Sequence, residues 1–440
     1  MTEREFALEV VRRLREAGFV AYWAGGCVRD ESFGLAPADY DVATDARLDQ
    51  VRRLFPRSKE VGANFGVVEV IGPRKNGGHF HVQVATFRAD GPYSDGRRPD
   101  TVVFATARED ARRRDFTING MFYDPLENRL IDYVGGQEDL RDRRLRAIGD
   151  PRARFAEDKL RLLRAIRFAA RFDLTIEPDT AAAIAEMAPQ ITVVSAERIA
   201  DELRRLLMHP TRLRGLTLMQ ELRLIPPIFP ELEPLFPLPN QADTRPGITV
   251  WQHALEVIQH LPEPISFPVA MAALLHDVGK GAAGQEPPYA DHPRLGSEMA
   301  ARISERLRLS NAETDRIVWL IEHHHDLDEA PTARPSRLKP LLGHPGSGDL
   351  ITLARANRLA QCLDPKPVDV ASQRRDEWQQ RGELDPPPLI TGNDLKAMGL
   401  TPGPDFKRIL DQIREQQLDG TLTTRAEALA LARAMAVETS

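Results

Sequence analysis

Two aspartates near the start of the chain have the spacing of a metal-binding carboxylate pair. Asp39 and Asp41 flank Tyr40 and precede Val42-Ala43, which predicts a β-strand, and residues two apart on a strand point to the same face. Neighbouring carboxylates repel each other unless a cation lies between them, and their hard oxygen ligands suit Mg²⁺. Such a site can hold two ions, one activating an attacking hydroxyl and one steadying a leaving pyrophosphate. We therefore expect Asp39 and Asp41 to be catalytic metal ligands in phosphoryl transfer.

A glycine pair upstream of these aspartates is suited to phosphate binding. Gly25-Gly26 follows a short apolar run and precedes Val28-Arg29-Asp30, where a helix is expected to begin. Glycines let backbone N–H groups approach a phosphate at a helix N-terminus, and Arg29 can add a charge-assisted contact. Alone, a Gly-Gly pair is typical of a tight turn and an Asp-x-Asp of a solvated loop. Their combination within one strand-turn-helix-strand span favours phosphoryl transfer.

These residues carry a family resemblance. Gly25 to Asp30 followed by Asp39-Tyr40-Asp41 resembles the signature of the class II tRNA nucleotidyltransferase and bacterial poly(A) polymerase family. Arg113 to Asn119 is similar to the family's second motif, in which an Arg-Asp pair contacts the ribose and phosphates. The resemblance implies that the nucleotide-binding residues here include Gly25, Gly26, Arg29, Arg114, Asp115 and Asn119.

Two further segments bear on the same resemblance. Arg88 to Phe104 resembles the loop and following strand of members that switch from CTP to ATP, which speaks against an enzyme that adds only CC. Gln83 is a departure, because relatives often carry a glutamate at this strand position. The third carboxylate of the head is therefore missing there, although Asp39 and Asp41 should still hold the metals.

A third motif, Glu157-Asp158-Lys159-Leu160-Arg161, is similar to the family's Glu-Asp-x-x-Arg motif. The resemblance implies that Asp158 and Arg161 read the base edge of the incoming nucleotide without a template. An arginine can donate two parallel hydrogen bonds, and a carboxylate can accept from the exocyclic amino group of cytosine or adenine. Outside this context the pattern is usually a helix-stabilising charge pair. We expect the next arginines, Arg164 and Arg167, to face solvent or tRNA phosphates.

A second group of reactive side chains lies in the C-terminal half. His253, His276-Asp277, His292 and the run from His323 to His325 resemble the HD phosphohydrolase superfamily, whose His, His-Asp and late Asp bind a divalent metal. The candidate ligands are His253, His276 and Asp277. The late Asp is replaced by Asn357, a neutral ligand, so metal affinity should drop. A scaffold role is therefore the alternative to hydrolysis.

The elements that position these motifs change character along the chain. Short apolar runs between glycine and proline turns predict strands before about residue 134, and helical periods begin at Glu157. We expect an α+β N-terminal nucleotidyltransferase head, with a mixed sheet and helices, followed by an all-α neck and an HD-type helical body. The expected divisions are a catalytic head (1–145), a neck with the nucleotide selector and RNA binding (146–225), an HD-type domain (226–370) and a helical tail (371–440). Ser195 to Arg198, in the neck, is expected to support the selector helix mechanically.

Composition sets the remaining limits. The 440 residues carry a formal net charge of −6, so nucleic acid must be held by a local basic region, and ten arginines between Arg141 and Arg171 supply one. Two cysteines, Cys27 and Cys362, allow no disulfide framework. We expect a cytoplasmic protein with no membrane span; the sequence does not indicate its oligomeric state.

The sequence therefore predicts template-independent addition of CCA, from CTP and ATP, to the 3′ end of tRNA with Mg²⁺ and release of pyrophosphate. Three alternatives within the class are an A-adding enzyme, a CC-adding enzyme and a poly(A) polymerase. The alternative from another class is a metal-dependent phosphohydrolase centred on the HD motif, with its own divalent ion.

Overall fold

The computed structural model describes residues 1–62, 66–75, 77–91, 102–240, 245–282 and 289–437. The chain divides into two compact units, Met1–Ile228 and Phe229–Ser440. The boundary falls in the proline-rich stretch between Pro226 and Pro246. Most of the loop expected between Arg88 and Phe104 lies outside the described residues.

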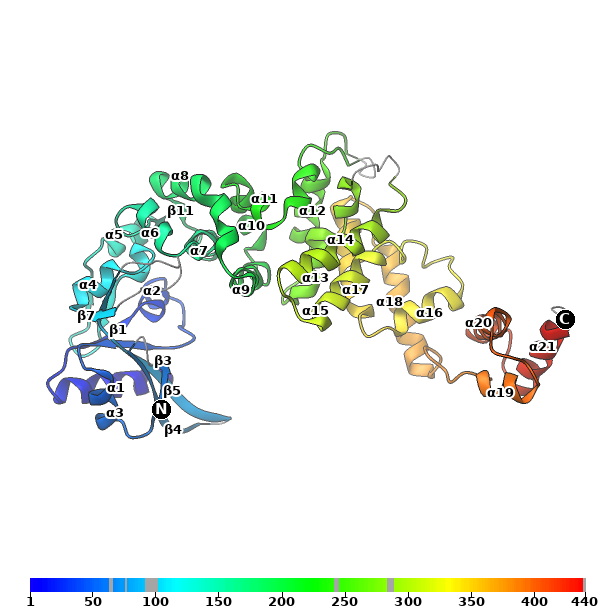
Figure 1. Ribbon diagram of the computed structural model, residues 1–440, viewed down its shortest axis with the longest axis horizontal. Helices are drawn as coiled ribbons and strands as arrows, with labels where there is room; N and C mark the ends of the chain where they lie inside the picture. Colours follow the sequence, from blue (N-terminus) through cyan, green and yellow to red (C-terminus); the bar gives the residue numbers. More distant parts are fainter. Residues whose placement is uncertain (63–65, 76, 92–101, 241–244, 283–288, 438–440) are drawn as a thin grey trace. The chain divides into compact units, whose positions relative to one another are not determined.

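A seven-stranded mixed sheet forms the centre of the first unit (Figure 1). Its only parallel pair among the described strands is β2 with β5; the other neighbours are antiparallel. This confirms the predicted mixed sheet. In sheet order the strands are β3 (Ser58–Gly62), β4 (Val67–Lys75), β5 (Gly78–Thr86), β2 (Asp41–Thr44), β1 (Ala21–Ala24), β8 (Phe122–Asp124) and β9 (Arg129–Ile131).

Helix α1 (Glu3–Glu16) covers one face of this sheet. Thr2 and Glu5 form a capping box at its start, which satisfies two backbone donors that would otherwise lack partners. Its apolar residues at helical spacing are buried in the same core cluster as side chains of β1, β2, β4 and β5. The remaining head elements are α2 (Gly26–Ser32), α3 (Leu48–Leu54), α4 (Ala107–Arg112), α5 (Gly136–Arg141) and the ribbon of β6 (Arg88–Asp90) with β7 (Val102–Phe104).

The rest of the first unit is helical, as predicted for the neck. Helix α7 (Leu160–Arg171) buries its apolar stripe, and Arg161 and Arg167 on its adjacent face are also largely buried. A two-stranded parallel pair, β10 (Arg144–Leu145) with β11 (Thr175–Ile176), precedes the later helices. The neck helices are α6 (Pro151–Glu157), α7, α8 (Pro178–Met187), α9 (Ala196–Leu207), α10 (Arg212–Glu221) and α11 (Ile225–Ile228).

The second unit is helical throughout its described residues. The apolar helix α13 (Phe267–Leu275) is buried along nearly its whole length and ends directly before His276-Asp277. The remaining helices are α12 (Val250–Gln259), α14 (His292–Arg306), α15 (Asn311–Glu322), α16 (Pro335–Gly343), α17 (Ser347–Ala360), α18 (Lys366–Arg381), α19 (Gly392–Ala397), α20 (Pro404–Leu418) and α21 (Arg425–Val437). Within the described residues, no helix combines the length and apolar character that a membrane span requires.

A close backbone approach in this unit depends on Gly279. It lies in the short 3₁₀ helix η5 (Val278–Gly281), and a Cβ there would stand 2.2 Å from the His292 carbonyl oxygen and 2.7 Å from the Gly296 nitrogen. Both atoms belong to the backbone of α14, so neither can move like a flexible side chain.

We predict that Gly279→Ala destabilises the second unit by about 2 kcal/mol or more, because overpacking outweighs the lower entropy of the unfolded chain. Thermal unfolding followed by circular dichroism measures the loss. The matched control is Gly403→Ala, where the nearest atom to the added Cβ is 4.0 Å away. Equal melting temperatures for the two variants would contradict the close approach.

Candidate active site

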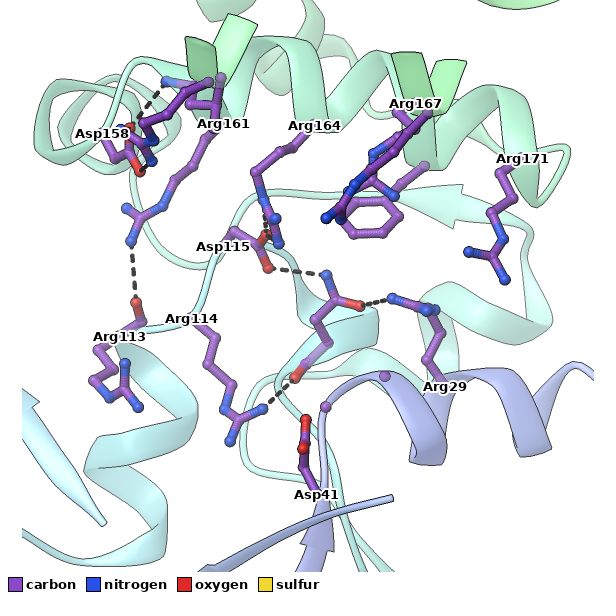
Figure 2. A pocket seen from close by; sticks show the side chains of 17 residues that line it. Arg29, Asp41, Arg113, Arg114, Asp115, Asp158, Arg161, Arg164, Arg167 and Arg171 are labelled. Atoms are coloured by element: carbon purple, nitrogen blue, oxygen red, sulfur yellow. Dashed lines mark hydrogen bonds and ion pairs between the residues drawn. The ribbon is translucent and has the colours of Figure 1, made fainter. Parts of the chain in front are cut away.

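A pocket of about 620 Å³ in the first unit collects nearly all the residues that the head and selector motifs predicted. Its lining includes Gly25, Gly26, Arg29, Asp41, Arg114, Asp115, Asn119, Asp158 and Arg161. Figure 2 shows the arginines of α7 pointing toward Arg29, Arg114 and Asp41 on the facing wall. The lining runs from Gly25 to Arg205, so residues up to 180 positions apart in sequence meet in one cavity. Of the predicted head residues, Asp39 alone does not line it.

The wall near Asp41 is built by the turn between β1 and α2. Gly25 caps α2 with φ +70°, a left-handed conformation that side chains rarely adopt, and a Cβ there would stand 2.9 Å from Arg114 Nη1. The glycine therefore lets Arg114 lie against the backbone of the turn. Arg114 is held there by Asp110, whose carboxylate accepts from Nη2 at 3.0 Å, and by the carbonyl oxygen of Asn119.

Asp41 and Asp39 are close enough for their charges to interact, but the two side chains differ in burial. Asp41 is the first residue of β2 and half-buried, whereas Asp39 lies in the loop before the strand and is exposed. The expectation that a single strand carries both is therefore wrong at Asp39. Burial raises the pKa of Asp41 to about 6, repulsion from Asp39 adds to the rise, and Arg114 opposes it. A cation bound between the carboxylates would relieve this repulsion, so the pair fits a divalent ion.

The neighbouring strand places Gln83 directly beside Asp41. The two residues are register partners in the parallel pair of β2 and β5, and Glu69 on β4 is the partner of Gln83 on the other side. The position where relatives often carry a glutamate is thus adjacent to the predicted metal ligand. In this chain the nearest carboxylate in that row stands one strand further away.

Asp115 joins the sheet side of the pocket to helix α7. Its Oδ2 accepts from Arg164 Nε and Nη2 at 2.9 and 2.6 Å, and its Oδ1 accepts from Asn119 Nδ2 at 2.9 Å. Asn119 Oδ1 in turn accepts from Arg29 Nη1 at 2.8 Å. Burial alone would raise the pKa of Asp115, but the charge of Arg164 and these hydrogen bonds bring it well below its usual range. Asp115 therefore stays ionised and orders two arginines and an amide.

The predicted selector pair lies at the other end of the pocket, where α6 meets α7. Asp158 accepts a bidentate contact from Arg198 of α9, at 3.2 Å from Nη1 to Oδ1 and 2.6 Å from Nη2 to Oδ2. Arg161 is largely buried; it donates to Glu157 and to the carbonyl oxygen of Arg154 at 2.7 Å. Both side chains are thus fixed in direction before any ligand binds.

The sequence reasoning missed the partners of these arginines. Arg164 and Arg167 were expected to face solvent or tRNA phosphates, but Arg164 pairs with Asp115, and Arg167 is buried and donates to Glu202 at 2.6 Å. Arg198 was expected to give mechanical support, and its contact with Asp158 supplies a specific form of it. The regular arginine spacing along α7 was the available signal. Nine arginines line the pocket: Arg29, Arg113, Arg114, Arg161, Arg164, Arg167, Arg171, Arg198 and Arg205.

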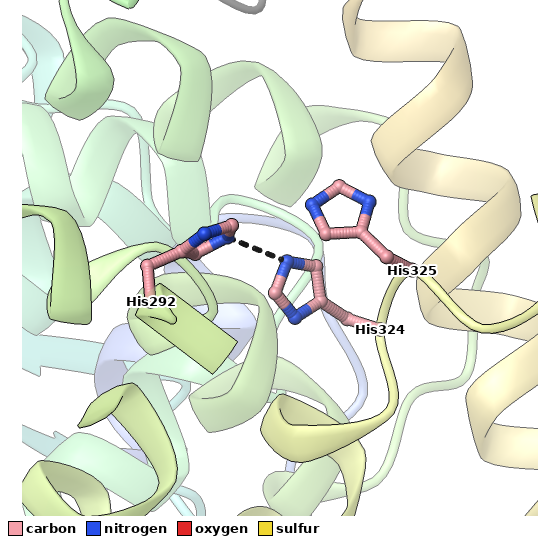
Figure 3. A group of neighbouring side chains, drawn as sticks. All are labelled: His292, His324 and His325. Atoms are coloured by element: carbon pink, nitrogen blue, oxygen red, sulfur yellow. Dashed lines mark hydrogen bonds between the residues drawn. The ribbon is translucent and has the colours of Figure 1, made fainter. Parts of the chain in front are cut away.

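In the second unit, the structure brings His253, His276 and Asp277 together, with one ligand atom of each within 4.8 Å of the others. All three side chains are buried. Asn357, at the place of the late Asp, accepts from His253 Nε2 at 2.9 Å. Burial lowers the pKa of His253 to about 4, and the neighbouring His276 adds to the drop. A further group, shown in Figure 3, is formed by His292, His324 and His325 and lies on the other side of Asp277.

Comparison with known proteins decides the family. Residues 21–146 match the family described as the poly(A) polymerase head domain, residues 173–236 the probable RNA- and SrmB-binding site of polymerase A, and residues 248–364 the HD domain. The CCA-adding enzyme of Limosilactobacillus fermentum is 30% identical over 429 residues, which cover 97% of this chain and 96% of the relative. The chain belongs to the tRNA nucleotidyltransferase and bacterial poly(A) polymerase family. Head domains of this family and HD domains generally depend on divalent metal ions.

Other known proteins match this chain over part of its length or in their structure. Poly(A) polymerase I of Haemophilus influenzae is 37% identical over 243 residues, but the match spans only 52% of this chain and 52% of that enzyme. The crystal structure of the Bacillus stearothermophilus CCA-adding enzyme in complex with CTP is 26% identical, with a TM-score of 0.73 over 100% of this chain and 99% of that chain. The family assignment thus rests on a sequence match over nearly the whole chain. The structural match also extends over the whole chain and supports the nucleotidyltransferase fold.

The raised pKa of Asp41 predicts a pH-dependent stability. Because the folded-state pKa, about 6, lies above the usual 3.8, its contribution is fully present below pH 4 and is lost as pH rises through 6. We expect the melting temperature of metal-free wild type to fall over this window relative to Asp41→Asn, which has no carboxyl to titrate. Added Mg²⁺ should restore wild type alone at pH 7. Parallel melting curves at every pH, with and without Mg²⁺, would contradict the assignment.

The Arg198–Asp158 contact predicts a positioning role for Arg198. In Arg198→Gln the Asp158 carboxylate loses a charge-assisted bidentate partner, so discrimination among nucleotides should fall about tenfold, with partial rescue by Arg198→Lys. Competition between CTP and UTP measures the ratio. Arg204→Gln, on the same helix and paired with Asp201, is the matched control. Unchanged discrimination between CTP and UTP in Arg198→Gln would contradict the positioning role of Arg198.

Proposed function

We propose that this protein adds CCA to the 3′ end of tRNA, without a template, from CTP and ATP. One observation carries the proposal: the pocket has the Asp158–Arg161 pair at one end and the carboxylate of Asp41 at the other, with arginines between them. A nucleoside triphosphate bound along the pocket would place its base at the Asp158–Arg161 end and its phosphates at the Asp41 end. The side chains take the place of a template strand.

Base selection follows from the chemistry of this pair. Arg161 supplies guanidinium donors, and Asp158 supplies oxygen acceptors for an exocyclic amino group. Cytosine and adenine carry such an amino group, whereas uracil and guanine present an oxygen at the corresponding place. Arg198 holds the Asp158 carboxylate in one orientation, so a base that presents an oxygen in place of the amino group would be repelled by it.

The reaction assigned to the other end is attack of the tRNA 3′-hydroxyl on the nucleotide α-phosphate, with pyrophosphate leaving. Asp39 and Asp41 would hold Mg²⁺, for which we propose two ions, and bound Mg²⁺ would neutralise charge on the reacting oxygens. Gly25 and Gly26 offer backbone N–H groups to phosphates, and Arg114 adds positive charge beside them. Positioning and charge neutralisation suffice for phosphoryl transfer, so no covalent enzyme intermediate is required.

The relatives support CCA addition over the alternatives, which are addition of A, of CC or of poly(A). A CCA-adding enzyme aligns with nearly the whole chain, whereas the more identical poly(A) polymerase I aligns with about half of it. Poly(A) addition is the second candidate because of that local identity. A cytoplasmic location, as expected for a protein that processes tRNA, remains a prediction.

The function is tested by stepwise extension of three tRNAs, which lack CCA, CA and A respectively, with each NTP and Mg²⁺. We expect two cytidines and one adenosine, then a stop. Addition of A only to CC-ended tRNA would make the protein an A-adding enzyme, and long A tails a poly(A) polymerase. No extension of any substrate would overturn the proposal.

The selector assignment has its own variant. Arg161→Ala should lose about 1–3 kcal/mol of discrimination, or roughly 5- to 150-fold in the CTP to UTP ratio, because a bidentate base contact is worth that much. Arg152→Ala is the control, since Arg152 is exposed, pairs with Glu186 and does not line the pocket. Unchanged selectivity in Arg161→Ala would remove the residue from base reading.

A further inference from the structure

Tyr40 stands between the two aspartates of the first unit, and its side chain lies in the core. It is 6% exposed and belongs to the core cluster that also contains Trp23 and apolar residues of α1. Asp41, the next residue, lines the pocket instead. Two neighbouring side chains thus lie in the core and in the candidate active site, so a contact that fixes Tyr40 also fixes the backbone on either side of it.

The Tyr40 hydroxyl has a specific partner on α2. It donates to Glu31 Oε1 at 2.6 Å, and the same oxygen accepts from Arg4 Nε of α1 at 3.0 Å. A hydrogen bond from a hydroxyl to a carboxylate is charge-assisted and stronger than one between neutral groups. The hydroxyl is therefore tied to α2 directly and to α1 through the shared carboxylate.

The Tyr40 ring is fixed as well as its hydroxyl. It meets the Trp23 ring edge to face, with the ring centroids 4.9 Å apart. The Arg4 guanidinium carbon lies 4.9 Å from the centroid of the same Trp23 ring. Both kinds of contact depend on the relative orientation of the groups, so the ring and the hydroxyl together hold Tyr40 in one orientation.

Asp39 has no comparable support of its own. It is exposed and precedes β2, and its side chain makes no hydrogen bond or ion pair with another described residue. Among the described residues, no backbone hydrogen bond outside the helices and strands involves residues 36–40. Consecutive Cα atoms are only about 3.8 Å apart, so the position of Asp39 relative to Asp41 depends on how Tyr40 is held.

We infer that Tyr40, through the hydrogen bond from its hydroxyl to Glu31, positions Asp39 and Asp41 for a divalent cation. The inference rests on the proposed function, in which this pair holds Mg²⁺. Two carboxylates that share an ion must be kept close together against their mutual repulsion. Tyr40 supplies this restraint from the core side of the chain, without contact with nucleotide or metal, and is therefore a positioning residue.

Binding of Mn²⁺ to the full-length protein, without nucleotide or tRNA, tests the inference apart from catalysis. Electron paramagnetic resonance of free Mn²⁺ gives the amount bound, and binding that persists in Asp41→Asn is subtracted because it belongs to other sites. We expect the Kd of the Asp41-dependent site to rise about tenfold in Tyr40→Phe, the lower end of the effect of groups that orient metal ligands. Glu31→Ala should raise it similarly, and the double variant no further, because both changes remove one hydrogen bond.

Tyr123→Phe is the matched control. Tyr123 also stacks on Trp23, with centroids 5.5 Å apart, and its hydroxyl donates to Asn128, but it lies on β8 and flanks no residue that lines the pocket. Its Mn²⁺ affinity should equal that of wild type. An equal Kd in Tyr40→Phe and wild type would overturn the inference and leave the proposed function intact. Wild type without Asp41-dependent binding would instead overturn the metal assignment on which both depend.

Kinetics separate positioning from a general loss of structure. In tRNA extension, Tyr40→Phe should need about tenfold more Mg²⁺ for half of its maximal rate, whereas the KM for tRNA should stay unchanged. Saturating Mg²⁺ should restore the wild-type rate, because the ligands themselves are intact. A rise in the KM for tRNA equal to the rise in the Mg²⁺ requirement would contradict the inference.

Discussion

Like-charge repulsion among arginines is the constraint on which the first unit depends. Nine guanidinium groups line one pocket. Two unit positive charges at a separation of about 5 Å would repel by about 3 kcal/mol at an effective dielectric constant of about 20. The chain meets this constraint with buried or half-buried carboxylates that each hold one or two arginines in place. Asp30, Asp115, Asp158 and Glu202 perform this task from four different elements. The pocket is thus positive enough to hold phosphates and rigid enough to keep its arginines apart.

The same pairing fixes where the two ends of the pocket lie relative to each other. Asp115 follows α4 in the head, Arg164 is on α7, and their contact joins the wall of the pocket near Asp41 to the helix that carries Arg161. A direct link of this kind matters because phosphoryl transfer tolerates little displacement between a bound base and the reacting phosphate. Arg198 extends the link to α9, so three neck and head elements share one set of charges.

The sequence predicted the parts of the site that are local and missed those that pair over distance. Gly25-Gly26, Asp41 and the Asp158–Arg161 pair were identifiable because their chemistry is contained within a few residues. The partners of Arg164 and Arg198 lie 49 and 40 positions away, and no periodicity reports such a pairing. Asp39 was misplaced because a pattern of alternate residues does not say where a strand begins. In the second unit, the sequence showed that Asn357 stands where an aspartate ligand was expected. Only the structure showed that the Asn357 side chain is hydrogen-bonded to His253.

The two units differ in the donor atoms that they would offer to a metal ion. Asp39 and Asp41 present carboxylate oxygens, which are hard ligands and suit an ion that keeps part of its hydration. The cluster of His292, His324 and His325 presents imidazole nitrogens, each oriented by an acceptor at its other ring atom. Carboxylate oxygens suit Mg²⁺, whereas imidazole nitrogens bind the first-row transition ions in preference to it. Ligand chemistry therefore distinguishes the carboxylate pair of the first unit from the histidine cluster of the second.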